Sequence, residues 1–189
     1  MNYVQTAQRI AEYRRQIAAI RQQMREAQAA VEPQQVSDYE FRTAEGTVRL
    51  SQLFGDRDQL IVIHNMGRSC PACTLWADGY NGLHEHVTSR AGFVVTSPDP
   101  PEVQRDFAAS RGWKFRMVSH AGSTFAADMG FRGGKGNWVP GVSVFQRQGE
   151  KIVRVSEATF SPGDDFCTLW HLFDLLPGGA GDFRPRYQY

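Results

Sequence analysis

Residues near the N-terminus place mostly apolar side chains at alternating steps of three and four, the spacing of one face of an α-helix. The positions that share this spacing are Tyr3, Thr6, Ile10, Tyr13, Ile17, Ile20, Met24, Ala27 and Val31. The seam predicts one long helix over residues 3–31, which Pro33 ends. This helix either docks on its own domain or joins two subunits in a homodimer. We treat residues 1–34 as an N-terminal helical arm.

From Ser37 onwards the apolar residues fall into short alternating or continuous runs, which predict β-strands. Strands are expected at 38–43, 47–52, 59–66, 92–97, 114–119, 141–146 and 151–157. Helical spacing follows at 70–90, 99–112 and 164–176, and residues 177–189 read as an irregular tail. Strand–helix–strand units followed by a hairpin and a helix predict an α/β domain over residues 35–189, a three-layer sandwich with a mixed central sheet.

Composition places the chain among ordinary soluble proteins. Hydrophobic residues make up 41% of the 189 positions, charged residues 22%, and the net charge is +1. So small a net charge gives no reason to expect a nucleic acid or an anionic membrane as partner. The polar N-terminal segment lacks the basic-then-apolar pattern of a secretion signal, so we expect a cytoplasmic protein.

The candidate reactive residues are Cys70 and Cys73. They follow the predicted buried strand 59–66 and lie at the start of the next predicted helix. A helix N-terminus favours the thiolate of Cys70, and Arg68 adds positive charge nearby. Pro71 suits the first helical turn, where its missing N–H costs little. Cys73 has the spacing needed to attack a mixed disulfide on Cys70. The pattern therefore predicts thiol–disulfide exchange, with Cys70 as nucleophile and Cys73 as resolver.

Several segments together resemble the thioredoxin superfamily and, more closely, the thioredoxin-like domain of unknown function family 899. They are "QLIVIHNM", "CPACTLWADGYNGL", "RGWKFRMVSHAGSTFAADMG" and "PGVSVF". The stretch "FRTAEGTVRLSQLFGDRDQL" is also similar to the start of peroxiredoxins. The resemblance spans residues 37–175 and implies a thioredoxin-like fold.

The resemblance also suggests roles for residues outside the cysteine pair. Thioredoxins carry a buried carboxylate six residues before the first cysteine, and here His64 would accept the proton of Cys73, with a pKa nearer neutrality. Pro140 stands where thioredoxin-like proteins have a cis-proline, so Val139 and Pro140 would dock a substrate, together with Arg68 and Pro71. Peroxiredoxins place Ser or Thr where this chain has Gly67.

Other interpretations stay open. The same cysteines could serve a thiol peroxidase, or they could be idle in a non-enzymatic binding module. A zinc site built from Cys70, Cys73, His64 and Cys167 is disfavoured by the long gap before Cys167, which is better explained as a core residue. Asp78 and Asp128 are expected to form local hydrogen bonds. We expect no cofactor, and a disulfide-containing protein or a small thiol as substrate.

Overall fold

The computed structural model describes residues 2–189 and divides them into two compact units, with the boundary between Gln34 and Gln35. The first unit consists mainly of the helix α1 (Tyr3–Ala29), as the spacing predicts. A capping box starts it, because the Asn2 side chain accepts the Gln5 N–H at 2.9 Å and the Gln5 side chain accepts the Asn2 N–H at 3.1 Å. The apolar side chains of its seam are exposed.

The second unit is built on one mixed sheet of eight strands in the order β1-β8-β7-β4-β5-β6-β2-β3. The strands are β1 (Gln34–Val36), β2 (Glu40–Thr43), β3 (Gly46–Arg49), β4 (Gln59–His64), β5 (Gly92–Ser97), β6 (Arg116–Ser119), β7 (Gly141–Gln148) and β8 (Lys151–Thr159). The central strands β4, β5 and β6 are parallel, whereas β7, β8, β2 and β3 pair antiparallel with their neighbours. The predicted mixed sheet is confirmed.

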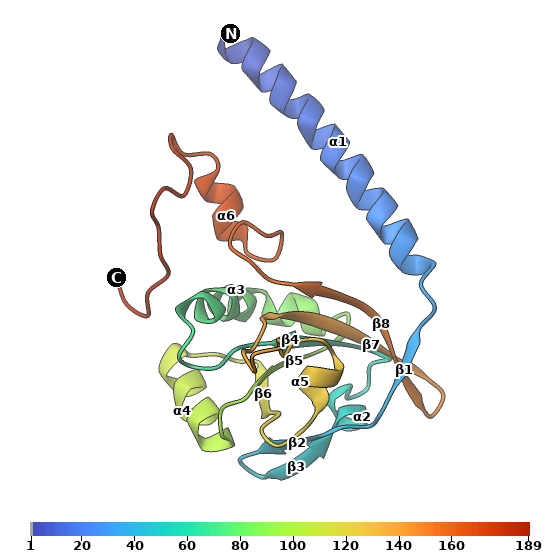
Figure 1. Cartoon of the computed structure of the whole chain (residues 1–189). Helices are drawn as coiled ribbons and strands as arrows, with labels where there is room; N and C mark the ends of the chain where they lie inside the picture. Colours follow the sequence, from blue (N-terminus) through green and yellow to red (C-terminus); the bar gives the residue numbers. More distant parts are fainter. Residues whose placement is uncertain (1) are drawn as a thin grey trace. The chain divides into compact units, whose positions relative to one another are not determined.

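Helices cover both faces of this sheet (Figure 1). They are α2 (Leu50–Leu53), α3 (Pro71–Thr88), α4 (Pro101–Arg111), α5 (Phe125–Asp128) and α6 (Thr168–Phe173). One core contains residues of α2 and α5, and the other contains residues of α3 and α6. The crossovers through α3 and α4 join adjacent parallel strands, and an ion pair between Asp78 and Arg111 holds these two helices side by side.

Alternation along β4 decides which core each of its side chains enters. Leu60 and Val62 belong to the core of α2 and α5, whereas Ile63 belongs to the core of α3 and α6. His64 continues the first set and stacks on Phe131 with ring centroids 3.8 Å apart. The chain then leaves the end of β4 at the middle of the sheet and enters α3, where the cysteine pair lies.

The last helix is shorter than the pattern predicts, because the carboxylate of Asp164 organises a loop before it. Asp164 accepts hydrogen bonds from the N–H groups of Ser161 and Phe166, at 3.0 and 2.9 Å, and from the indole of Trp76 at 3.2 Å. An aspartate that bonds to nearby N–H groups competes with the helix ladder. The helix therefore starts only at Thr168.

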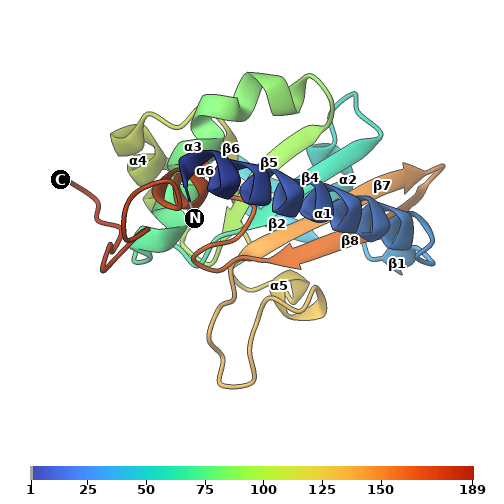
Figure 2. The ribbon, with the colours of Figure 1, turned by 90° about the horizontal axis from the view of Figure 1, so that it is seen from above.

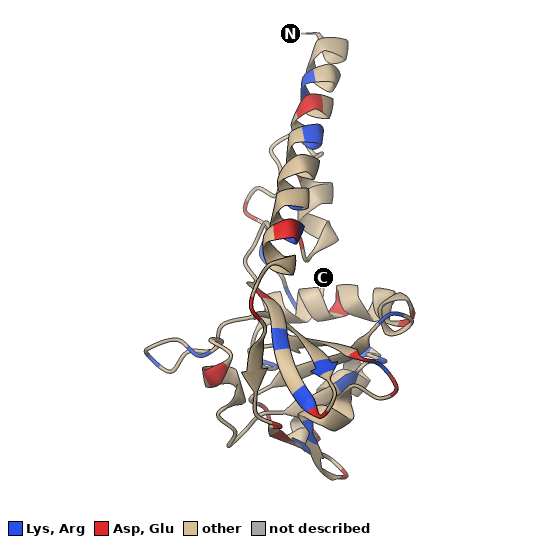
Figure 3. Cartoon of the chain, turned by 90° about the vertical axis from the view of Figure 1, so that its right-hand side faces the viewer, with Lys and Arg blue, Asp and Glu red and all other residues tan. Residues whose placement is uncertain are grey.

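Acidic and basic residues are interspersed in each of the two units (Figure 3). The loop between α5 and β7 projects away from the sheet (Figure 2). Among the residues that the structure describes, no helix is both long and apolar enough to cross a membrane.

Candidate active site

Cys70 and Cys73 occupy the first turn of α3. Cys70 is the N-cap, with extended backbone (φ −104°, ψ 100°), and its Sγ atom accepts the N–H of Cys73 at 3.0 Å. Its carbonyl oxygen accepts two hydrogen bonds from Thr74, from the N–H and the hydroxyl, both at 3.1 Å. Pro71 fills the first helical position, as expected. The helix start therefore fixes the sulfur of Cys70 over free backbone N–H groups.

The two thiols have opposite acid–base properties. A hydrogen bond from the Cys73 side chain, helped by the N–H groups of Cys73 and Ala72, lowers the pKa of Cys70 to about 7. The hydrogen bond to Cys70, followed by burial, raises the pKa of Cys73 far above its ordinary range. Cys70 is partly exposed and Cys73 is buried, and both are free thiols. The pair thus consists of an accessible thiolate beside a protonated, shielded thiol.

The loop that presents Cys70 is held by two polar side chains. Asn65 accepts the N–H of Gly67 at 2.8 Å, and Asp99 accepts the N–H of Arg68 at 2.7 Å. Gly67 has φ 101°, and a Cβ atom there would lie 2.9 Å from a carboxylate oxygen of Asp99. The position that carries a hydroxyl in peroxiredoxins therefore needs glycine here, because both the backbone and the neighbouring carboxylate exclude a side chain.

His64 lies under the site in an apolar sandwich. Its ring stacks on Phe131 and on Phe125, and its Nε2 lies 2.9 Å from the hydroxyl of Ser143. Burial holds the pKa of His64 well below its usual value, so the imidazole is neutral. The expectation of a pKa nearer neutrality is therefore wrong. Within the described chain its Nδ1 is buried without a hydrogen-bond partner.

A small cavity joins His64 to the buried thiol. It measures about 10 Å³ and is lined by Cys73, His64 and Pro140, and also by Ile63, Asn65, Trp76 and Phe160. A space of this size holds one water-sized molecule at most. A substrate cannot enter it, so any substrate has to reach Cys70 from the outer side.

The predicted cis bond before Pro140 is wrong, because the described residues contain no cis peptide bond. A trans bond is the ordinary state even before proline, and the local bonding fits it. The N–H of Val139 donates to the Phe131 carbonyl at 2.9 Å, and the Pro140 carbonyl accepts the N–H of Phe160 at 2.8 Å. These two groups are therefore already bonded inside the protein, although Pro140 does lie beside Cys73.

The remaining candidates have structural roles. Asp78 accepts hydrogen bonds from Arg111 and from the indole of Trp113, the latter at 2.8 Å, and Asp128 accepts the hydroxyl of Tyr39 at 2.8 Å. Asp128 also accepts the Thr124 hydroxyl at 2.6 Å, so the prediction of local hydrogen bonding is confirmed for Asp128. The partners of Asp78 lie 33 and 35 positions away in the sequence, so its bonds are not local. Cys167 is buried in the core of α3 and α6. No group of three or more described His, Cys, Asp or Glu residues has the geometry to hold a metal ion.

One residue beside the site has no signal in the sequence. Tyr187, in the predicted irregular tail, donates its hydroxyl to the carbonyl oxygen of Arg68 at 2.7 Å. The two residues are 119 positions apart, and neither the spacing nor the resemblance connects them. Burial, and then the charge of the cysteine pair, raise the pKa of Tyr187, so the phenol stays a hydrogen-bond donor.

Solved structures with this fold include several peroxiredoxins. The peroxidoxin BcpB of Mycobacterium tuberculosis is 25% identical, with a TM-score of 0.54 over 72% of this chain and 88% of that chain. PrxQ of Xylella fastidiosa is 14% identical, with a TM-score of 0.59 over 69% and 87%. Peroxiredoxin Q of Xanthomonas campestris is 17% identical, with a TM-score of 0.54 over 64% and 78%. The fold is thus thioredoxin-like, as the resemblance implies.

Among curated protein sequences, none matches this chain. The model of one family, described as "Bacterial protein of unknown function (DUF899)", matches residues 4–188. This match covers almost the whole sequence, including the cysteine pair, the sheet and the C-terminal tail. The chain therefore belongs to the DUF899 family, on a thioredoxin-like fold.

Proposed function

We propose that the protein is a thiol–disulfide oxidoreductase in which Cys70 attacks and Cys73 resolves. The observation that carries this proposal is the asymmetry of the pair. The pKa of Cys70 is about 7 and its side chain is partly exposed, whereas Cys73 is buried and has a raised pKa. An attacking thiol works best when its pKa is near the ambient pH, because it is then both ionised and nucleophilic.

The chemistry balances as a two-step exchange. The Cys70 thiolate attacks one sulfur of a substrate disulfide, forms a mixed disulfide and releases one substrate thiolate. Cys73 then gives up its proton and attacks the Sγ atom of Cys70, which releases the second substrate thiol and leaves a Cys70–Cys73 disulfide. Two electrons pass from the pair to the substrate. An external thiol reductant has to restore the reduced pair for the next turnover.

His64 is the proposed proton acceptor for Cys73 in the resolving step. Its free Nδ1 and the small cavity that it shares with Cys73 support this role. Because burial lowers its pKa, the imidazole holds this proton only transiently. Replacing His64 by Gln should slow the release of the mixed disulfide and leave the first attack by Cys70 unchanged. If the wild type and His64→Gln release the mixed disulfide at equal rates, His64 has no part in the mechanism.

A thiol peroxidase is the second candidate, because several structural neighbours are named peroxiredoxins. Cys70 would then attack the O–O bond of a peroxide, releasing an alcohol or water and becoming a sulfenic acid. Cys73 would condense with it to a disulfide and release water. The glycine at position 67 removes the hydroxyl that peroxiredoxins have there, so we favour disulfide exchange.

Thiol trapping over a series of glutathione redox ratios tests the proposal. We expect Cys70 and Cys73 to interconvert between dithiol and disulfide, and Cys167→Ser to behave like the wild type. Turnover of a small disulfide and turnover of hydrogen peroxide then separate the two enzymes. A pair that never forms a disulfide across the series would leave only a binding role, and peroxide turnover alone would favour the peroxidase. The predicted cytoplasmic location would keep this pair in a reducing environment.

A further inference from the structure

The C-terminal strap, residues 180–189, returns from α6 to the loop that presents Cys70. In Figures 1 and 2 the red C-terminal segment runs from α6 to the side of the domain where α4 lies. Its contact with the site is the Tyr187 hydroxyl, which donates to the Arg68 carbonyl at 2.7 Å. Arg68 belongs to the turn closed by the Cys70 N–H and the Gly67 carbonyl, 3.1 Å apart. The phenol therefore lies on the turn that carries the nucleophile.

The backbone and ring of Tyr187 are fixed by α4. Its carbonyl oxygen accepts a hydrogen bond from Arg111 at 2.7 Å, and Arg111 is itself paired with Asp78 on α3. The ring meets Phe107 edge-on, with centroids 6.1 Å apart and an interplanar angle of 87°. Tyr187 thus bridges α4 to the Cys70 loop, and α4 is tied to α3 at the same point.

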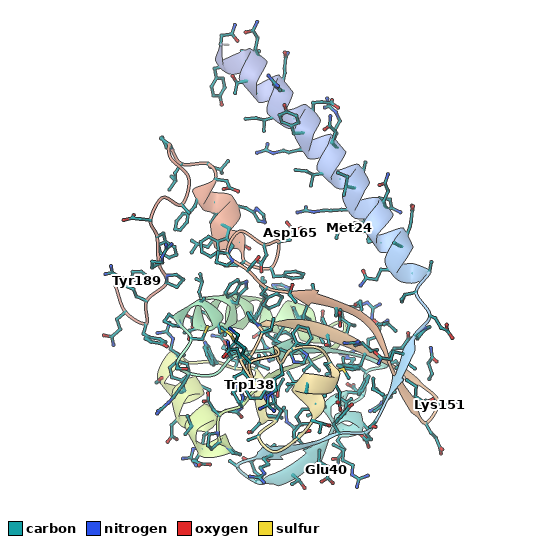
Figure 4. The ribbon with its side chains drawn as sticks, viewed as in Figure 1. Met24, Glu40, Trp138, Lys151, Asp165 and Tyr189 are labelled. Carbon is teal, nitrogen blue, oxygen red and sulfur yellow. The ribbon has the colours of Figure 1, made fainter. Side chains whose placement is uncertain are left out.

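Aromatic contacts on both sides of Tyr187 hold the rest of the strap. Phe183 packs against Trp170 and Phe173 of α6, with centroids 6.0 and 5.0 Å apart. Tyr189, which is labelled in Figure 4, stacks on Phe183 with ring centroids 6.3 Å apart. The strap is therefore a docked segment with an anchor at α6 and another at the Cys70 loop.

We propose that the strap, through Tyr187, covers the approach to Cys70 and restricts the dithiol to small thiol and disulfide molecules. This inference rests on the proposed function, since it names the substrate class of the same site. Two further observations support it. The internal cavity beside Cys73 is too small for a substrate, so the outer approach is the one available. The Val139 N–H and Pro140 carbonyl, which could pair with an extended peptide, are already bonded within the protein.

The size of the reagent that reaches Cys70 tests the strap without any need for turnover. The background is Cys73→Ser with Cys167→Ser, which leaves Cys70 as the single cysteine. The rates of labelling with N-ethylmaleimide and with a maleimide on a long polyethylene glycol chain are compared as a ratio. The same maleimide chemistry in both reagents cancels any change in the pKa of Cys70.

Tyr187→Phe removes only the hydroxyl, and we expect the ratio of bulky to small labelling to rise about fivefold, the factor for losing one hydrogen bond of ordinary net strength. Tyr187→Ala also loses the ring contact with Phe107 and should raise the ratio further. Tyr189→Phe removes a hydroxyl that accepts the Arg186 N–H at 3.1 Å, within the strap itself, and leaves the contact of Tyr187 with the Arg68 carbonyl in place, so it should raise the ratio less than Tyr187→Phe does. Circular dichroism confirms that each variant is folded.

The proposal is overturned if the background protein reacts with both reagents as readily as an unfolded control, or if Tyr187→Ala leaves the ratio unchanged. A second experiment measures the turnover of disulfide substrates by proteins that keep Cys73. The wild type should reduce a small disulfide and leave the disulfides of insulin nearly unreduced. Tyr187→Ala should reduce insulin faster than the wild type does and should reduce the small disulfide at the same rate. If neither disulfide is reduced while the labelling ratio still responds to Tyr187, the strap stands and the proposed oxidoreductase function fails.

Discussion

The N–H of Cys73 donates a hydrogen bond to the Sγ atom of Cys70 across 3.0 Å, so the resolving residue also stabilises the attacking thiolate. Its side chain adds a second hydrogen bond, which is the largest cause of the lowered pKa of Cys70. The same bond, with burial, keeps the Cys73 thiol protonated. The acidity of the two thiols and their order of attack are therefore set by these hydrogen bonds at the start of α3.

The first prediction separates the two hydrogen bonds to Cys70. In Cys73→Ser the hydroxyl can still donate, whereas in Cys73→Ala only the backbone N–H groups of residues 72 and 73 remain. The midpoint of the Cys70 alkylation rate against pH should lie near 7 in the serine variant and higher in the alanine variant. Iodoacetamide kinetics in a Cys167→Ser background give both midpoints. Faster alkylation at pH 7 of a Cys70→Ser protein, which keeps Cys73, would contradict the assignment of the nucleophile.

The second prediction concerns the loop before the cysteines. Gly67→Ala forces a side chain onto a backbone with φ 101° and against Asp99, so it should destabilise the protein by about 1–3 kcal/mol. Gly79 is in the interior of α3 with no heavy atom within 4 Å of a built Cβ. Gly79→Ala should therefore stabilise the protein by about 0.5–1 kcal/mol. Urea unfolding measures both, and equal effects of the two substitutions would refute this account of the loop.

The third prediction follows from the buried imidazole. Because the folded-state pKa of His64 lies well below 6.5, the unfolded chain binds a proton as the pH falls below 6.5 and the folded chain does not. Stability contributed by this residue is present above pH 6.5 and is lost as the pH falls. We therefore expect the unfolding free energy to fall between pH 6.5 and 5.

His120, whose pKa burial lowers to about 4, acts in the same direction, so a comparison of variants is needed. His64→Gln should show a smaller fall in unfolding free energy between pH 6.5 and 5 than the wild type. His86→Gln, at an exposed position of α3, should keep the wild-type slope. If the slope of His64→Gln equals that of the wild type, His64 is protonated in the folded protein.

Features that depend on nearby residues could be predicted from the sequence. The apolar run of β4, the Pro71 start of α3 and the two cysteines lie within a few positions of each other, and local rules place them. The hydrogen bonds that Val139 and Pro140 make with Phe131 and Phe160 instead come from the folded arrangement, and the Tyr187 contact joins residues 119 positions apart. Contacts between residues far apart in the chain produce no periodic pattern of apolar positions. The docking of the strap could therefore not be predicted from the sequence.

The last prediction concerns α1 as a contact between two subunits. We propose that its seam pairs with a second copy of the chain, because Ile10, Ile17 and Met24 are exposed and follow a heptad spacing. Ile17→Lys places a charge on the seam and should convert a dimer to a monomer. Ala18→Lys adds the same charge to an exposed position off the seam and should leave the dimer intact. Light scattering on the full chain distinguishes these states, and a wild-type protein that is monomeric at tens of micromolar would contradict the proposal.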